Sequence, residues 1–259
     1  MGVFLFDELI FGPVKSRRLG VSLGINLLPT HKKICSFNCI YCECGWTKES
    51  MPVANTLPDK ETFRKLLKEK LISLKGTDLE PDSITFAGNG EPTIHPHFAE
   101  IVTETLELRE LYAPKAKVTV LTNGSMLHKK SVISALQQVD YRMLKLDGGT
   151  EASIQAINMP MKSFKLDAYV EQLIGFDGDL IIQSLFLRGE HNGKQIDNTT
   201  EEEVSAWLNL LKKIKPQKVM IYAIERDTPA SGLEKIGRAA LEQIALKVQQ
   251  NGIAAEVFA

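Results

Sequence analysis

The chain has 259 residues, of which 44% are hydrophobic and 24% are charged, and its formal net charge is −1. This composition is typical of a globular protein with enough apolar residues for a large core. The near-zero charge disfavours a dedicated nucleic-acid-binding protein, which usually carries a clear basic excess. No apolar run approaches the roughly 20 residues needed to cross a bilayer. Residues 1–10 are apolar but include Asp7 and Glu8 and lack the basic start of a signal peptide, so we expect a cytoplasmic protein without a membrane segment.

Short strand-like runs alternate with longer helical patterns along the chain. The predicted strands are residues 21–28, 83–87, 117–122, 142–146, 180–186 and 218–224. The predicted helices are residues 60–74, 97–111, 129–139, 166–174, 201–214 and 233–250. This alternation predicts an α/β fold with a parallel sheet and six strand–helix units, which is fewer than the eight of a closed barrel. We expect a single domain over residues 1–259, with residues 1–20 as an N-terminal extension.

The loop after the first predicted strand carries three cysteines in the spacing C-x-x-x-C-x-x-C, namely Cys35, Cys39 and Cys42. Three thiolates on one short loop are able to hold three irons of a [4Fe–4S] cluster and leave the fourth iron open to a small molecule. A zinc site that includes Cys44 is an alternative, although zinc sites usually have a distant second pair of ligands. A disulfide framework is disfavoured because it requires an oxidising compartment.

This loop, with Tyr41 directly before the third cysteine, resembles the cluster loop of the radical S-adenosylmethionine (radical SAM) superfamily. The resemblance implies a (β/α)6 partial TIM barrel with the cluster loop after the first strand. It also implies that Cys35, Cys39 and Cys42 bind a [4Fe–4S] cluster whose open iron is chelated by S-adenosylmethionine, with Tyr41 beside this cofactor. In the family, one electron from the cluster cleaves the cofactor and produces a 5′-deoxyadenosyl radical.

The second predicted strand ends in Gly88, Asn89, Gly90 and Glu91. Glycines let a backbone approach a ligand closely, and Glu91 offers a carboxylate to an ammonium group. The segment resembles the motif with which radical SAM proteins bind the amino group of S-adenosylmethionine. A plain turn is the alternative interpretation.

The next two predicted strands also end in polar residues. Thr122 and Asn123 resemble a family strand end near the methionine part of the cofactor, and a simple Asn-Gly turn is the alternative. Lys145 and Asp147 share one strand face, because side chains alternate with a period of two. Since unpaired buried charges are costly, we expect these two residues either to pair with each other or to contact polar groups of the cofactor. They are the candidate catalytic residues.

The last two predicted strands contribute three further candidates for cofactor binding. Gln183 is a polar residue within an apolar run, which predicts that it faces the barrel interior. Ala223 and Ile224 resemble the family's backbone stretch that packs the adenine of the cofactor. His95 and His97 are interpreted as part of a turn that enters a helix rather than as metal ligands, because no carboxylate spacing of a known metal motif accompanies them.

A basic segment with Arg17 and Arg18, together with the turn at residues 158–160, resembles a radical SAM subgroup related to wyosine-base synthases. Either arginine is a candidate for gripping the substrate, and a solvated turn is the alternative. The four cysteines of the sequence leave no ligands for a second cluster. The resemblance to this subgroup therefore implies structural kinship rather than the same reaction.

These resemblances imply a single-cluster radical SAM enzyme, a lyase or an oxidoreductase, that acts on a small molecule. A modified nucleobase is the candidate substrate, in a queuine-lyase-like reaction, and nucleic acid is disfavoured by the near-neutral charge. Flavodoxin or ferredoxin is expected to supply the electron. Two alternatives stay open, namely an activase of a glycyl-radical enzyme and a non-catalytic iron–sulfur or zinc module.

Overall fold

The computed structural model describes residues 4–48 and 57–259. Its strands are β1 (Ile10–Ser16), β2 (Gly20–Ile25), β3 (Ser83–Phe86), β4 (Lys117–Thr122), β5 (Tyr141–Lys145), β6 (Ile181–Leu185), β7 (Leu187–His191), β8 (Lys194–Asp197), β9 (Lys218–Tyr222), β10 (Leu233–Lys235) and β11 (Ala254–Phe258). Its helices are α1 (Lys60–Leu74), the 3-10 helix η1 (Pro92–Ile94), α2 (Phe98–Tyr112), α3 (Lys130–Gln138), α4 (Glu151–Asn158), α5 (Leu166–Ile174), α6 (Glu201–Ile214) and α7 (Arg238–Gln250).

Residue contacts divide the chain into two compact units. The N-terminal unit comprises Leu5–Cys35 and Lys48–Arg142, and the C-terminal unit comprises Met1–Phe4, Ser36–Thr47 and Met143–Ala259. The predicted single domain over the whole chain stays a prediction.

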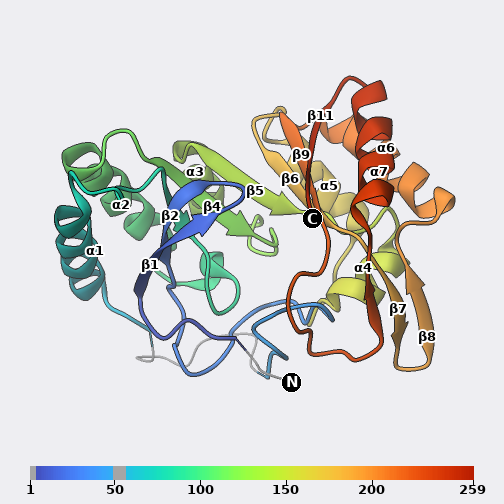
Figure 1. Cartoon of the computed structure of the whole chain (residues 1–259), viewed down its shortest axis with the longest axis horizontal. Helices are drawn as coiled ribbons and strands as arrows, with labels where there is room; N and C mark the ends of the chain where they lie inside the picture. Colours follow the sequence, from blue (N-terminus) through green and yellow to red (C-terminus); the bar gives the residue numbers. More distant parts are fainter. Residues whose placement is uncertain (1–3, 49–56) are drawn as a thin grey trace. The chain divides into compact units, whose positions relative to one another are not determined.

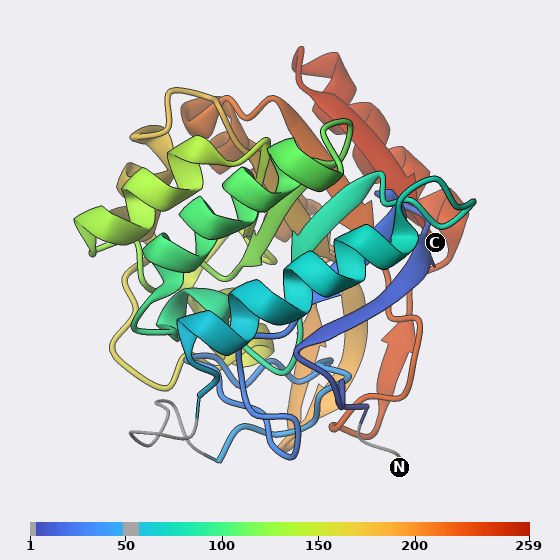
Figure 2. The ribbon, with the colours of Figure 1, turned by 90° about the vertical axis from the view of Figure 1, so that its left-hand side faces the viewer.

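The N-terminal unit is built on four strands in the order β1-β2-β3-β4 (Figure 1). β1 and β2 are antiparallel, whereas β2, β3 and β4 run parallel. The helices α1, α2 and α3 lie across one face of these strands (Figure 2). α1 begins after Asp59, whose carboxylate accepts a hydrogen bond from the Thr62 amide at 2.8 Å, and it buries Phe63, Leu67 and Leu71 on one side. The carboxyl ends of β3 and β4 lead into the segments that carry predicted cofactor residues.

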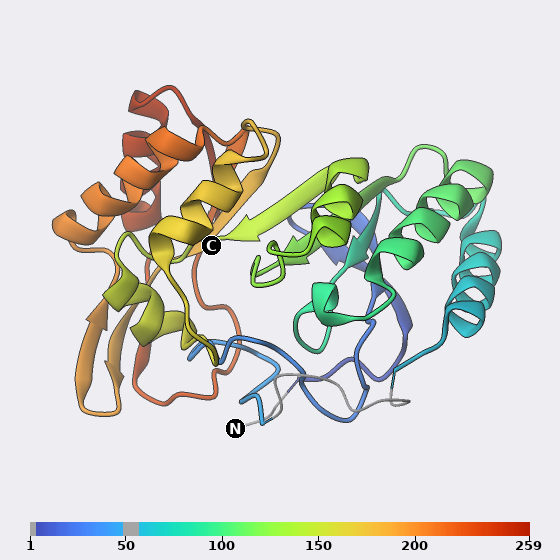
Figure 3. The same cartoon turned by 180° about the vertical axis from the view of Figure 1, so that it is seen from behind.

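The C-terminal unit contains β5 from Met143 onward and the parallel strands β6, β9 and β11, in that order, and a separate antiparallel sheet in the order β10-β7-β8. The helices α5, α6 and α7 lie next to one another beside the parallel strands (Figure 3). Trp207 of α6 is buried, and its indole nitrogen donates a hydrogen bond to the Leu146 carbonyl at 3.1 Å. This contact anchors α6 at the end of β5, where Lys145 and Asp147 lie.

The structure confirms the six predicted strands and the six predicted helices, with one correction at the start of the last helix. The predicted helix over residues 233–250 begins only at Arg238, because Leu233–Lys235 pairs with β7 as the edge strand β10. The strands β1, β7, β8 and β11 and the helix α4 are not among the predicted elements, and β1 lies within the predicted N-terminal extension. Among the described helices, none combines the length and the apolar character needed to cross a membrane.

Candidate functional site

The loop after β3 packs its backbone directly against the segment that leads into Cys35. The Ile34 amide donates to the Asn89 carbonyl at 2.9 Å, and the Glu91 amide donates to the Ile34 carbonyl at 3.0 Å. A Cβ atom on Gly90 would lie 1.7 Å from this Ile34 oxygen, and Gly90 has a φ of 138°. Only glycine fits there, so the predicted cofactor loop also fixes the position of the first cysteine.

Glu91 places a buried carboxylate at the centre of a hydrogen-bond network in this unit. Its Oε1 accepts hydrogen bonds from the Thr93 amide at 3.1 Å, the Thr93 hydroxyl and the Thr122 hydroxyl at 2.7 Å. Its Oε2 accepts one from the Asn123 amide at 2.7 Å. Burial raises the pKa of Glu91, and these hydrogen bonds oppose the rise because they stabilise the ionised form. The Asn123 side chain in turn donates to Cys35 Sγ at 3.5 Å, so the network joins a predicted cluster ligand to three predicted cofactor residues.

Asn89 uses its side chain to hold other parts of the same unit. Its Nδ2 donates to the carbonyls of Phe6 at 2.8 Å and Pro29 at 3.0 Å, and its Oδ1 accepts a hydrogen bond from the Phe6 amide at 2.8 Å. Both amide hydrogens are thereby used. A Cβ atom on the neighbouring Gly88 would lie 2.4 Å from Asn26 Oδ1. Gly88 and Asn89 therefore shape the loop, and their contact with the cofactor stays a prediction.

A second buried network, in the C-terminal unit, is centred on Asn158 at the end of α4. Its Nδ2 donates to Asp147 Oδ2 at 2.7 Å, to the Tyr41 hydroxyl at 3.3 Å and to Cys39 Sγ at 3.4 Å. The Tyr41 hydroxyl donates to the same Asp147 oxygen. The Asn158 carbonyl also accepts a hydrogen bond from the Asn38 amide at 3.0 Å. This network joins Cys39 to the predicted residues Tyr41 and Asp147 through Asn158, the first residue of the turn at residues 158–160, which was not among the predicted site residues.

Lys145 forms the cationic part of this second network. Its Nζ lies 3.6 Å from Asp147 Oδ2 and donates to the Tyr222 hydroxyl at 2.8 Å. It also lies 5.2 Å from the centre of the Tyr41 ring and 5.5 Å from that of Tyr222. Burial is the largest single influence and lowers the pKa of Lys145, but Asp147, Tyr222 and Cys39 together outweigh it, and the net effect raises the pKa. Burial, followed by the charge of Asp147, raises the pKa of Tyr41 well above its usual range. Lys145 is therefore a fixed cation at neutral pH.

The other predicted residues of this unit lie on neighbouring strands. Gln183 of β6 is buried, stands in register with Lys145 of β5, and donates from Nε2 to Met143 Sδ at 3.2 Å. Ala223 is buried and Ile224 is half-buried, directly after β9. Their roles toward the cofactor stay predictions.

The predicted cluster cysteines are divided between the two units, because Cys35 belongs to the N-terminal unit and Cys39 and Cys42 belong to the C-terminal unit. Within residues 4–48 and 57–259, no group of three or more metal-ligating side chains is assembled. The donor chemistry fits an iron–sulfur cluster, since Cys35 and Cys39 each accept a hydrogen bond from an asparagine amide, and such bonds to sulfur tune clusters. The assignment of the three thiolates to the cluster stays a prediction.

His95 and His97 are held in the turn between η1 and α2. The His97 amide donates to Nδ1 of the buried His95 at 3.2 Å, and the His97 ring lies 3.0 Å from Glu100 Oε2. These contacts favour the interpretation of both histidines as turn residues. Burial lowers the pKa of His95 to about 4.

The pKa of His95 predicts a specific loss of stability in acid. Because its native pKa lies below that of the unfolded chain, its contribution is complete above about pH 6.5 and is lost as the pH falls toward 4. In His95→Gln, we expect this part of the pH dependence, on the order of 1–3 kcal/mol, to disappear. Denaturant unfolding of both proteins across this pH range measures the difference, and equal slopes of unfolding free energy against pH would contradict the prediction.

Comparisons with known proteins identify the family of the chain and its fold. Residues 30–171 match the family model described as the radical SAM superfamily. The chain is 34% identical over 231 residues to a Brachyspira hyodysenteriae protein named GTPase Obg, which covers 86% of this chain and 31% of that protein. It is 30% identical over 228 residues to a Helicobacter pylori protein named UPF0026 protein, which covers 84% of this chain and 67% of that protein. The chain thus spans less than one third of the first relative and about two thirds of the second.

The fold is similar to that of SuiB from Streptococcus suis. The crystal structure of SuiB bound to the precursor peptide SuiA has a TM-score of 0.64 and 16% identity, and the match covers 91% of this chain and 48% of that chain. SuiB bound to S-adenosylmethionine gives a TM-score of 0.61 with 17% identity, over 92% of this chain and 47% of that chain. This similarity confirms the predicted α/β fold class of a partial TIM barrel. The chain therefore belongs to the radical SAM superfamily, whose members use a [4Fe–4S] cluster and S-adenosylmethionine as cofactors.

Proposed function

We propose that the chain is a radical SAM enzyme, a lyase or an oxidoreductase, that removes a hydrogen atom from a small molecule of the modified-nucleobase class. One observation carries the proposal, namely that in each unit an asparagine contacts both a cysteine of the cluster loop and a buried acidic residue. These contacts are Asn123 with Cys35 and Glu91, and Asn158 with Cys39 and Asp147. Hydrogen-bonded networks of this kind are typical of metal sites, in which groups bonded to the ligands hold those ligands in position.

When bound, the cluster and S-adenosylmethionine supply the one-electron chemistry that makes hydrogen removal possible. In this proposal the side chains of the protein bind and orient. Glu91 offers its carboxylate to the amino group of the cofactor, and the protonated Lys145 offers hydrogen bonds to its carboxylate or ribose hydroxyls. Asp147, whose Oδ1 accepts the Leu185 amide at 2.8 Å, holds Lys145 and Tyr41 in place.

A separate electron donor of the flavodoxin or ferredoxin class is part of the proposal. The sequence has four cysteines, all within residues 35–44, so it provides ligands for one cluster and none for a second that would relay electrons. In this proposal the electron therefore comes from a donor separate from these 259 residues.

The proposal is tested by anaerobic reconstitution with iron and sulfide, followed by reduction with dithionite in the presence of S-adenosylmethionine. We expect 5′-deoxyadenosine to form, and its formation to require the reductant. A reconstituted cluster that leaves the cofactor intact, with dithionite and with reduced flavodoxin alike, would refute the enzymatic function and favour a non-catalytic iron–sulfur module.

A further inference from the structure

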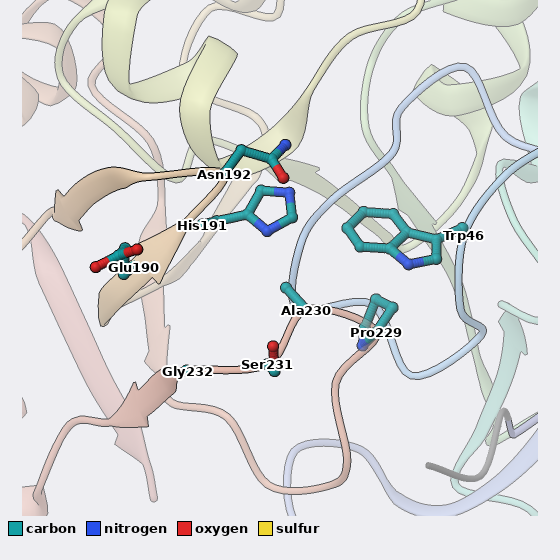
Figure 4. Close-up of a pocket in the computed structure, with 8 residues that line it drawn as sticks. All are labelled: Trp46, Glu190, His191, Asn192, Pro229, Ala230, Ser231 and Gly232. Atoms are coloured by element: carbon teal, nitrogen blue, oxygen red, sulfur yellow. The ribbon is translucent and has the colours of Figure 1, made fainter.

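A cavity of about 470 Å³ opens in the C-terminal unit beside the segment that follows the cluster loop (Figure 4). Three pieces of chain surround it, namely Trp46, the turn of the β7–β8 hairpin at residues 190–192, and the loop at residues 229–232. Its volume lies within the range of about 300–1,000 Å³ that is usual for small-molecule sites. None of the residues assigned so far to the cofactor lines it.

Two aromatic rings form one wall of this cavity. The Trp46 and His191 rings have their centroids 5.5 Å apart and their planes 25° apart, and Figure 4 shows the two rings next to each other. Because each aromatic contact needs roughly 3.5 Å, a third ring does not fit between them at this spacing. A planar ligand must therefore stack on an open face of one ring, and Trp46, which is 38% exposed, provides such a face. Base–aromatic stacking contributes about 1–3 kcal/mol per ring.

Polar groups lie close to this aromatic wall. The Asn192 side-chain amide lies beside the His191 ring, and the Ser231 hydroxyl lies across the cavity (Figure 4). An amide and a hydroxyl offer both donors and acceptors, which suits the edge of a nitrogen heterocycle better than a plain hydrocarbon ring. The site thus combines a stacking surface with mixed hydrogen-bonding groups.

The walls of the cavity are bonded to the segment that carries Cys39 and Cys42. The Ala230 amide donates to the Ile40 carbonyl at 3.2 Å, and Arg226 Nη1 lies 2.7 Å from Glu43 Oε2. A ligand in the cavity therefore touches chain that is tied directly to the cluster loop. We propose that this cavity binds the planar heteroaromatic ring of the substrate by stacking on Trp46 and His191, an inference that rests on the proposed function and names the subsite of its substrate.

Calorimetric titration of the reconstituted full-length protein with the four ribonucleosides tests this subsite, with ribose as the ligand that lacks the ring. We expect at least one nucleoside to bind and ribose not to bind. Trp46→Ala and His191→Ala should each weaken that nucleoside about tenfold, as expected for the loss of one stacking contact. Tyr141→Ala, which removes an exposed aromatic side chain in the N-terminal unit, serves as the matched control and should bind as the unaltered protein does.

Three results would overturn the subsite. The first is that no nucleoside binds at millimolar concentration. The second is that Trp46→Ala and His191→Ala, both folded by circular dichroism, bind the nucleoside with unchanged affinity. The third is that saturating S-adenosylhomocysteine displaces the nucleoside, which would make the cavity the adenine site of the cofactor. If 5′-deoxyadenosine still forms in any of these cases, the proposed function survives and only the subsite fails. Conversely, nucleoside binding without any 5′-deoxyadenosine would refute the function and leave the binding site.

Discussion

Cys39→Ala is expected to leave the protein folded but without its iron–sulfur cluster. Three thiolates are needed for three irons, and the sequence offers one other thiol, Cys44, two residues beyond Cys42. Cys39 is only 7% exposed and its Sγ accepts the Asn158 amide, so no neighbouring thiol occupies an equivalent environment. The measurement is iron and acid-labile sulfide per chain, with the visible absorption spectrum, after anaerobic reconstitution.

Cys44→Ala is the matched control, because it removes a thiol from the same loop without removing a predicted ligand. We expect this variant to bind iron and sulfide as the unaltered protein does. The ligand assignment would be wrong if Cys39→Ala kept a full cluster, or if Cys44→Ala lost it. Loss of the cluster in Cys44→Ala alone would point instead to a site in which Cys44 takes the place of Cys39.

Local signals in the sequence predicted the elements that position the site. The bounds of α1, α5 and α6 agree with the prediction to the residue, because apolar periodicity and capping side chains such as Asp59 and Thr200 act within a few residues. The ends of these strands were also predictable from the sequence, since β3, β4 and β5 each end where polar residues follow a nearly apolar run. Lys145 and Asp147 were predicted to share one strand face and either to pair or to contact the cofactor; β5 ends at Lys145, and Lys145 Nζ lies 3.6 Å from Asp147 Oδ2.

Contacts between distant parts of the chain account for what the sequence did not reveal. Asn158 binds Asp147, Tyr41 and Cys39 at once, and Tyr41 lies 117 residues away from it in the chain. The turn at residues 158–160 was noted for its resemblance to a subgroup, but no periodicity or local motif predicts which side chains Asn158 contacts. Similarly, residues 233–235 form a strand only because β7 offers them a partner.

The β7–β8 hairpin is a different case, because a signal for it was present. Asn192 and Gly193 form its turn, with φ values of 53° and 72°, and an Asn-Gly pair between two short runs is a strong hairpin signal. The polar flanking residues of both strands hid it, since apolar alternation is weak there. The end of this hairpin forms one wall of the cavity beside Trp46.

Replacing the Glu91 carboxylate should abolish tight cofactor binding while the cluster is retained. Glu91→Gln keeps the shape of the side chain and an oxygen for the Thr93 and Thr122 donors, but it removes the negative charge offered to the amino group of S-adenosylmethionine. Hydrogen bonds to charged groups contribute about 1.5–3 kcal/mol, which corresponds to a roughly ten- to hundredfold loss of affinity. Equilibrium binding of S-adenosylmethionine to the reconstituted variant measures this loss.

The new amide of Glu91→Gln faces the Asn123 amide, which is also a donor, so this substitution also removes a hydrogen bond. A weaker affinity must therefore be separated from a disturbed structure. Thermal unfolding and iron content therefore accompany the binding measurement. Glu100→Gln, which neutralises a 53% exposed acidic residue in the same unit, should bind the cofactor with unchanged affinity. If Glu91→Gln also binds unchanged, the carboxylate serves only to hold Thr122 and Asn123, and the amino group of the cofactor must find its partner elsewhere. If affinity falls while cluster content and folding persist, the carboxylate acts on the cofactor itself, as its burial among four hydrogen-bond donors and its link to Cys35 through Asn123 lead us to expect.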